Sequence, residues 1–349
     1  MCPFGRHPAG YPSTMESLVS VIIPNRNGAD TIGTCLAAAR ASHHGNFEII
    51  VVDDGSEDHS IEVIERHPCK LVRLEQHGGA AQARNAGASH SRGRILFFTD
   101  ADCLLQPDTL ALAARTLALE GPNAIVGGTY TPAPHDRRFF SRFQSIFIHY
   151  FETRNAPAAD YVATHALAMD ASVFRCNRGF AEHVRPILED VEFSHRLRRA
   201  GCRLVMNPAI QVRHIFNYSL IRSLRNAFTK SLYWTRYAIG NRDLLADSGT
   251  ASLGLKLNVI LFAGNAGLVS GFVVTVKMVL LACMAVALAF NLFVNRGLLL
   301  AYRRAEGLGF AFMAALYYLL LYPLAIGAGA GAGMLRHLFS SPVRPQENR

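Results

Sequence analysis

Residues 94–103 of this 349-residue chain read Arg94-Ile-Leu-Phe-Phe-Thr-Asp-Ala-Asp-Cys103. The apolar run at 95–98 has the length and composition of a buried β-strand. It is followed at once by Asp100 and Asp102, two carboxylates one residue apart. Two close carboxylates repel each other and stay ionised most easily beside a cation. The stretch therefore predicts a strand that ends in a site for a hard divalent ion, Mn²⁺ or Mg²⁺.

Similar apolar runs and helical patterns surround this strand. Val19-Ser-Val-Ile-Ile23 ends at Pro24, and Phe47-Glu-Ile-Ile-Val-Val52 ends in Asp53-Asp54-Gly55-Ser56. Further strands are predicted at 69–74, 94–99 and 124–126, and helices at 31–40, 79–89 and 108–119. This alternation predicts an α/β fold with a Rossmann-like, mostly parallel sheet and helices on both faces.

Polar clusters follow the second and fourth of these strands. Ligands of open α/β sheets bind outside the carboxyl ends of the strands. Each cluster alone is also compatible with a turn and a helix N-cap. Departure of a nucleoside diphosphate is the chemistry that needs a metal there, because the metal offsets the growing negative charge. His77-Gly78-Gly79 could present backbone amides to an anion, or could simply begin a helix.

The chain carries a formal net charge of +9, and many of its basic residues precede a strongly apolar region. Those between 213 and 256 are Arg213, Arg222, Arg225, Lys230, Arg236, Arg242 and Lys256. They do not form a dense tract with interleaved aromatic residues, so nucleic acid is not the expected partner. Their position favours a surface that faces anionic membrane lipid on the cytoplasmic side.

The second half of the chain has the composition of a membrane protein. Residues 219–239 combine an apolar stripe with a basic face, which is typical of a helix lying in the membrane interface; packing on a soluble domain is the alternative. A crossing needs about 20 apolar residues. Residues 257–294 could therefore form two crossings that turn at Lys277, with a basic loop at 295–307 and a third crossing at 308–333. One long first helix would give two crossings instead.

The cysteine pattern and the N-terminal residues indicate in which cellular compartment the soluble part is expected. Seven cysteines are scattered without Cys-x-x-Cys spacing, so they are predicted to be reduced thiols without a zinc site. Residues 1–17 lack the apolar core of a signal peptide and are predicted to be a disordered leader. The soluble part is therefore expected in the cytoplasm, next to a multi-pass anchor in the cell membrane.

The ordered motifs of residues 18–215 resemble those of family 2 glycosyltransferases with the GT-A fold. The matching segments are Val19-Ser-Val-Ile-Ile-Pro24 with Asn27, Val52-Asp-Asp-Gly-Ser56, Gly79-Ala-Ala-Gln-Ala-Arg-Asn-Ala-Gly87, Thr99-Asp-Ala-Asp102, Gly179-Phe180 and Glu189-Asp-Val-Glu-Phe-Ser-His-Arg-Leu197. The resemblance implies a nucleotide-sugar site. Its residues would be Pro24, Asn27, Asp54, Arg84, Asn85 and Asp100.

The resemblance also implies roles in metal binding and catalysis. Asp102, Asp100 and His214 would hold the metal. Asp190 would be the base that takes the proton of the acceptor hydroxyl, as an inverting transfer requires. On a helix Asp190 shares a face with Phe193 and Leu197, whereas Glu189 points about 100° away. The alternative is that both acids have no catalytic role and occur there because the helix dipole favours acidic residues at a helix N-terminus.

Glu189 and His165 would lie on the acceptor side, although relatives often carry Asn where this chain has His165. The expected organisation is a leader at 1–17, a GT-A domain at 18–215, an amphipathic interfacial helix and linker at 216–252, a transmembrane region at 253–335 and a polar tail at 336–349. The sequence lacks the Gln-x-x-Arg-Trp motif of processive relatives, which favours transfer of a single sugar.

Three functions remain open from the sequence. The first is an inverting transfer from a nucleotide sugar, taken as a UDP-sugar, to a hydroxyl of a lipid, lipid-linked or glycan acceptor. The second is a polyprenyl-phosphate sugar synthase, whose anionic acceptor needs no general base, so that Glu189-Asp190 argues against it. The third is a non-catalytic membrane scaffold that retains the fold. Asp54, Asp100, Asp102 and Asp190 argue against the third.

Overall fold

The computed structural model describes residues 17–183 and 187–339. The chain divides into two compact units. Unit 1 comprises Met1–Arg137 and Phe151–Asn217, and unit 2 comprises Arg138–Tyr150 and Tyr218–Arg349. Residues 1–16 of the predicted leader and 340–349 of the predicted tail lie outside the described residues.

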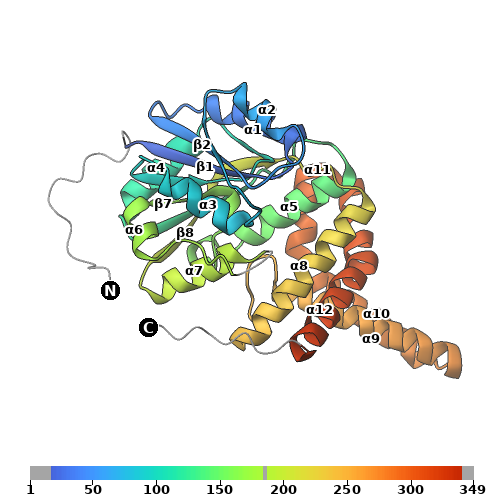
Figure 1. Ribbon diagram of the computed structural model, residues 1–349. Coiled ribbons are helices and arrows are strands. Elements are labelled where there is room, and N and C mark those ends of the chain that lie inside the picture. Colours follow the sequence, from blue (N-terminus) through green and yellow to red (C-terminus); the bar gives the residue numbers. More distant parts are fainter. Residues whose placement is uncertain (1–16, 184–186, 340–349) are drawn as a thin grey trace. The chain divides into compact units, whose positions relative to one another are not determined.

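Unit 1 contains an eight-stranded sheet in the order β3-β2-β1-β4-β7-β6-β8-β5 (Figure 1). The strands are β1 (Val19–Asn25), β2 (Phe47–Asp53), β3 (Lys70–Arg73), β4 (Ile95–Phe98), β5 (Cys103–Leu105), β6 (Ala124–Tyr130), β7 (Leu167–Asp170) and β8 (Arg203–His214). Neighbours from β3 to β4 run parallel, as do β6 and β8. The predicted α/β class is therefore confirmed.

Two strands run against this parallel direction. β7 is antiparallel to β4 and β6, and β5 is antiparallel to β8. Only residues 99–102 separate β4 from β5, and a parallel crossover needs a dozen or more residues. The sheet is therefore mixed beyond β4, and β5 and β7 are strands that the sequence pattern did not predict.

Helices cover the sheet of unit 1 on both faces. They are α1 (Ala29–Arg40), α2 (Ser60–Glu65), α3 (Ala80–Ser89), α4 (Thr109–Glu120), α6 (Ala171–Cys176) and α7 (Glu189–Arg199), with short turns η2 (Ala156–Ala158) and η3 (Thr164–Ala166). Figure 1 shows α1 and α2 on one side of β1 and β2 and α3 on the other. A Cβ at Gly87 of α3 would lie 2.5 Å from Ile22 Cγ2, so this glycine lets the helix approach the sheet.

Helix α5 (Phe139–Thr153) crosses the boundary between the units, and the helices after it belong to unit 2. These are α8 (Leu220–Asn241), α9 (Leu253–Thr275), α10 (Met278–Val294), α11 (Arg296–Leu316), the π-helical turn η4 (Tyr317–Leu321) and α12 (Tyr322–Phe339). Ser219 and Ser252 cap α8 and α9, because their hydroxyls accept the Arg222 and Leu255 amides. Lys277 separates α9 from α10, where the turn was predicted.

The loop predicted at 295–307 is wrong, because α11 begins at Arg296. Leu298 and Tyr302, four residues apart, are buried inside unit 2, so this segment has a helical apolar face that its arginines masked in the sequence. Gly307 has φ +86° and interrupts the helix. The apolar segment predicted from residue 308 starts at this break.

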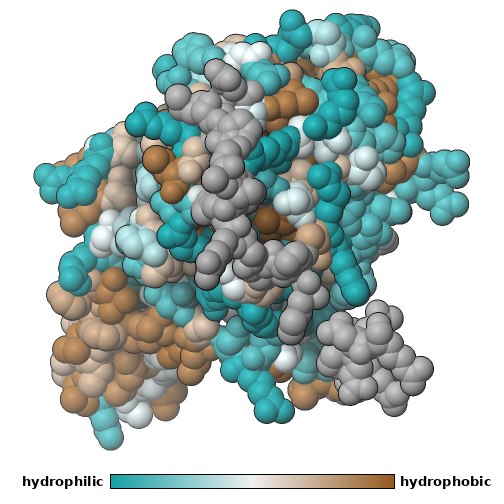
Figure 2. All heavy atoms as spheres, turned by 90° about the vertical axis from the view of Figure 1, so that its left-hand side faces the viewer, coloured by the Kyte–Doolittle hydropathy of each residue, from teal (hydrophilic) through white to brown (hydrophobic). Residues whose placement is uncertain are grey.

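Two helical stretches of unit 2 are long and apolar enough to cross a membrane, by length and composition only. They are Leu253–Thr275 and the stretch Arg296–Phe339, whereas α10 is apolar but shorter. Most exposed large hydrophobic side chains belong to these helices and α10. Figure 2 shows hydrophobic side chains gathered in the lower left of one face, with hydrophilic ones over most of the rest.

A buried chain of amides joins the apolar helices of unit 2. Asn291 Nδ2 donates to Asn258 Oδ1 at 2.8 Å, and Asn295 Nδ2 donates to Asn291 Oδ1 at 2.8 Å. Asn258 Nδ2 donates to the Tyr318 carbonyl at 2.8 Å, and the Tyr318 hydroxyl donates to Asn295 Oδ1 at 3.0 Å. Such polar pairs hold apolar helices in one register, because their groups have no water to bind.

The cysteines differ in part from the prediction. Five described cysteines are free thiols, namely Cys35, Cys69, Cys103, Cys202 and Cys283. Cys176 is disulfide-bonded, so the prediction of reduced cysteines is wrong for this residue. Spacing along the chain could not reveal it, because a disulfide depends on distance in space.

Candidate active site

A buried arginine connects two of the predicted site carboxylates. Arg84 of α3 donates from Nη1 to Glu189 Oε1 at 2.6 Å and from Nη2 to Asp100 Oδ1 at 2.7 Å. Its side chain is 4% exposed. Burial opposes the charged guanidinium, but Asp100 and Glu189 outweigh it and raise the pKa of Arg84. Burial alone would raise the pKa of Asp100, but the charge of Arg84 outweighs it and lowers this pKa.

Asp190, the predicted base, is the second residue of α7. Its carboxylate accepts the Val191 amide at 2.8 Å and the Thr164 amide at 3.4 Å. Burial and the neighbouring Glu189 raise the pKa of Asp190 to about 6, although Arg84 and these amides act against the rise. Leu188, just before the helix, has a left-handed backbone with φ 81°, a strained conformation of the kind found beside functional residues.

His165 of η3 lies in a buried polar group that the sequence only partly indicated. His165 Nε2 is 3.4 Å from Glu152 Oε2, which also accepts the Thr129 hydroxyl at 2.7 Å. Burial would lower the pKa of His165, but Glu152, helped by Asp100 and Asp190, raises it. Tyr130 stacks on His165 with ring centroids 4.1 Å apart. Glu152 had no signal in the sequence, since it lies within the apolar pattern of α5.

The candidate metal site forms where β5 pairs with β8. Cys103 lies opposite His214 in this pair, and the Ile215 amide donates to the Asp102 carbonyl at 2.8 Å. His214 Nε2 is therefore 3.4 Å from Asp102 Oδ1, and ligand atoms of Asp102, Cys103 and His214 lie within 4.8 Å of one another. Asp100 is not in this group among the described residues; its carboxylate binds Arg84.

The donor set fits a hard or borderline divalent ion. Carboxylate oxygen suits Mg²⁺ and Mn²⁺, and imidazole nitrogen suits transition metals. Burial and the nearby Asp102 raise the pKa of the Cys103 thiol well above its usual value. A soft sulfur ligand also suits Zn²⁺ or Cu⁺ better than Mg²⁺ or Mn²⁺. Asp102 and His214 are therefore the residues that could hold the ion.

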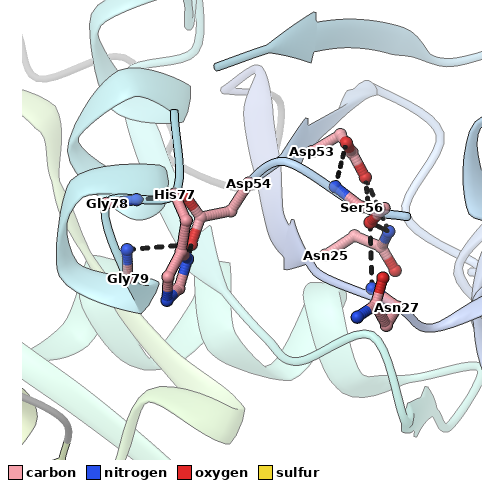
Figure 3. A network of polar contacts seen from close by, with 8 residues as sticks. All are labelled: Asn25, Asn27, Asp53, Asp54, Ser56, His77, Gly78 and Gly79. Atoms are coloured by element: carbon pink, nitrogen blue, oxygen red, sulfur yellow. Dashed lines mark hydrogen bonds and ion pairs between the residues drawn. The ribbon is translucent and has the colours of Figure 1, made fainter. Parts of the chain in front are cut away.

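The ends of β1 and β2 are joined by a second polar network (Figure 3). Asp53 accepts from Asn25 Nδ2 at 3.0 Å and from the Ser56 amide at 3.0 Å. The Asn27 amide donates to the Ser56 hydroxyl at 2.9 Å. Asn27 has φ 51°, which turns the chain sharply after the strand. Pro24 lies in β1 directly before this network.

Asp54 points away from Asp53 and holds the loop before α3 (Figure 3). Its carboxylate accepts the Gly78 amide at 2.6 Å and the Gly79 amide at 2.8 Å, and it lies 2.8 Å from His77 Nδ1. The amides that could have bound an anion from outside thus bind the chain's own carboxylate. Asp54 positions the start of α3, the helix that carries Arg84.

Asn85 joins α3 to the segment before α7. Its side-chain amide donates to the Phe180 carbonyl and accepts the Phe180 amide, both at 2.9 Å. Asn85 Nδ2 also lies 2.9 Å from Glu182 Oε1. These contacts place Asn85 as a support between α3, which carries Arg84, and the segment that leads to the carboxylates of α7.

Comparison with known proteins agrees with this arrangement. Residues 20–177 match the family model described as glycosyl transferase family 2. Glycosyltransferase GlyG of Streptococcus pneumoniae is 28% identical over 131 residues, and glycosyltransferase AglE of Haloferax volcanii is 31% identical over 134 residues. Each match covers 36% of this chain and 44% of the relative. The chain thus matches less than half the length of these relatives.

The likeness to one solved structure extends over most of the chain. Mannosyltransferase PcManGT from Pyrobaculum calidifontis, solved in complex with GDP-Man and Mn²⁺, is 21% identical with a TM-score of 0.56. The match covers 92% of this chain and 87% of that one. It shows that the two proteins share a fold. Residues 20–177 thus match the glycosyl transferase family 2 model, and the chain shares its fold with this mannosyltransferase.

Proposed function

We propose that this protein is an inverting glycosyltransferase that moves a single sugar from a nucleotide sugar to a hydroxyl of a lipid, lipid-linked or glycan acceptor. Asp190 carries the proposal. It is half-buried at the start of α7, its pKa is raised to about 6, and Glu189 beside it is bound by Arg84. A carboxylate with this pKa is ionised at neutral pH yet basic enough to take the proton of an attacking hydroxyl.

The donor would bind at the carboxyl ends of β1, β2 and β4. Asn27, Asp54 and Asp100 come from these strand ends, where ligands of open α/β sheets bind. Asp102 and His214 would hold Mn²⁺ or Mg²⁺. That ion would supply positive charge for the departing diphosphate. The occurrence of GDP-Man and Mn²⁺ in the related mannosyltransferase fold supports this donor class.

Unit 2 would anchor the protein in the cell membrane, with the transferase domain in the cytoplasm. Only 6% of the most apolar window of α9 is buried within the protein, so an apolar solvent is needed to cover this helix. The basic residues of α8, among them Arg222, Arg225 and Arg236, suit an anionic lipid surface.

Asp190→Asn tests the proposal in the purified full chain with nucleotide-sugar donors and Mn²⁺. Loss of a general base lowers a rate roughly 10²–10⁴-fold, and donor binding by calorimetry should persist. Glu192→Gln, on the same helix, is the matched control and should retain activity. Full activity of Asp190→Asn would overturn the base assignment and favour an anionic acceptor such as a polyprenyl phosphate. Failure of the wild-type chain to bind any nucleotide would favour a non-catalytic scaffold.

A further inference from the structure

Unit 2 contains a cavity of about 260 Å³ that the transfer chemistry does not use. Its walls come from α5, α8, the segment 244–251, α9 and α12, all within unit 2. The lining is mainly apolar, and its deeply buried members include Ala227, Ala238, Leu255 and Tyr322. The volume lies near the lower end of small-molecule sites, which span roughly 300–1,000 Å³. Such a space suits one hydrocarbon chain rather than a bulky polar ligand.

The rim of the cavity is exposed and apolar. Leu245 is 71% exposed and Ile260 is 60% exposed, and both line the cavity. Ile260 belongs to α9, whose exposed apolar residues continue with Val269, Val273 and Val274. An apolar surface of this kind is stable next to hydrocarbon rather than water. The cavity therefore opens onto a surface that lipid chains would cover.

Three polar side chains give the cavity a chemical preference. Lys230 lines it, is exposed, and has no carboxylate partner in the described part of the chain. Lys256 also lines it, but donates to the Ala246 carbonyl and lies near Asp243 and Asp247. Gln144 is 2% exposed, and its Oε1 finds no hydrogen-bond partner among the described residues. This buried amide oxygen is free to accept a hydrogen bond from a molecule that enters the space.

We propose that this cavity binds the single hydrocarbon chain of an amphiphile whose anionic phosphate head is held by Lys230. The apolar walls take the chain, and the lysine at the opening pairs with the phosphate. The proposal rests on the proposed membrane location of unit 2 but not on sugar transfer. The phosphate amphiphile could come from a membrane phospholipid or from an isoprenoid phosphate, which share this chemistry.

A photoactivatable hexadecyl phosphate, with a diazirine in its chain, tests the proposal on the purified full chain in detergent. Mass spectrometry should locate the label on residues that line the cavity. Ala330→Phe fills the cavity and should abolish this labelling, whereas Ala328→Phe, an exposed position on the same helix outside the lining, should retain it. Equal labelling of the cavity in both variants would overturn the proposal.

Two further measurements remain decisive even if Ala330→Phe fails to fold. Lys230→Gln should weaken labelling by hexadecyl phosphate but not by the matching hexadecanol probe, and Arg66→Gln, an exposed position in unit 1 outside the lining, should change neither. Competition by phosphatidylglycerol or by a polyprenyl phosphate would support the site and identify its source, whereas competition by neither would contradict it. Asp190→Asn should label like wild type, which separates this site from the proposed catalysis.

Discussion

Arg84 and Glu189 form a 2.6 Å ion pair across 105 residues of sequence. The same guanidinium binds Asp100, so one buried cation links the end of β4 to the start of α7. Asp190 follows Glu189 directly and therefore depends on this pair for its position and its charge environment. Arg84 thus connects the proposed donor side of the site with the proposed base.

Replacement of Arg84 by Met should destabilise the protein. It would leave Glu189 and Asp100 without their buried cation, and breaking a buried pair costs about 3–5 kcal/mol. Denaturant unfolding measures this loss. Arg73→Met is the control, because Arg73 and its partner Glu65 are both more than half exposed, and surface pairs contribute only about 0–1 kcal/mol. Equal losses in the two variants would contradict the structural role of Arg84.

The rate of transfer should fall at acidic pH. A base acts only when deprotonated, and the pKa of Asp190 is raised to about 6 by burial and Glu189. We expect kcat/KM to decrease about tenfold per pH unit below this value. Glu189→Gln removes the neighbouring negative charge, so the acidic limb should move to lower pH. An unchanged limb in that variant would assign the titration to another group.

Divalent metal should be required for donor cleavage. Chelation should stop the reaction, and added Mn²⁺ should restore it. Asp102→Asn and His214→Gln should each raise the Mn²⁺ concentration needed for half-maximal activity, because each removes a proposed ligand. Asp108→Asn removes an exposed carboxylate that pairs with His43, and should leave the requirement unchanged. Activity that persists in chelator would exclude this role for Asp102.

Two glycines should control the packing of α8 on α12. A Cβ at Gly329 would lie 2.3 Å from the Phe228 carbonyl oxygen, and one at Gly333 would lie 2.6 Å from the Leu232 carbonyl oxygen. Gly329→Ala and Gly333→Ala should each cost about 1–3 kcal/mol by overpacking, seen as a lower Tm in detergent. Gly331→Ala meets nothing within 4 Å and should be neutral or stabilising. A similar decrease in Tm in all three variants would contradict this, because it would show that the cost does not come from overpacking between α8 and α12.

The sequence was sufficient for the elements of the first half of unit 1. The runs at 19–23 and 47–52 are β-branched, apolar and ended by Pro or Asp, and they form β1 and β2. It was insufficient for 295–307, where the arginines obscured the buried face of Leu298 and Tyr302. The local sequence pattern predicts an element well where the apolar residues are the buried ones and the polar residues are the exposed ones. It fails where charged and buried faces alternate within one helix.

The sequence by itself determined the strand-ending carboxylates Asp54, Asp100 and Asp102 and the acidic start of the helix at Asp190. Only the tertiary structure decided their partners. It placed Arg84 between Asp100 and Glu189, His214 beside Asp102, and Glu152 beside His165. The physical reason is that a buried charge needs a partner in space. That partner can come from any element the fold brings near, so spacing along the chain does not specify it.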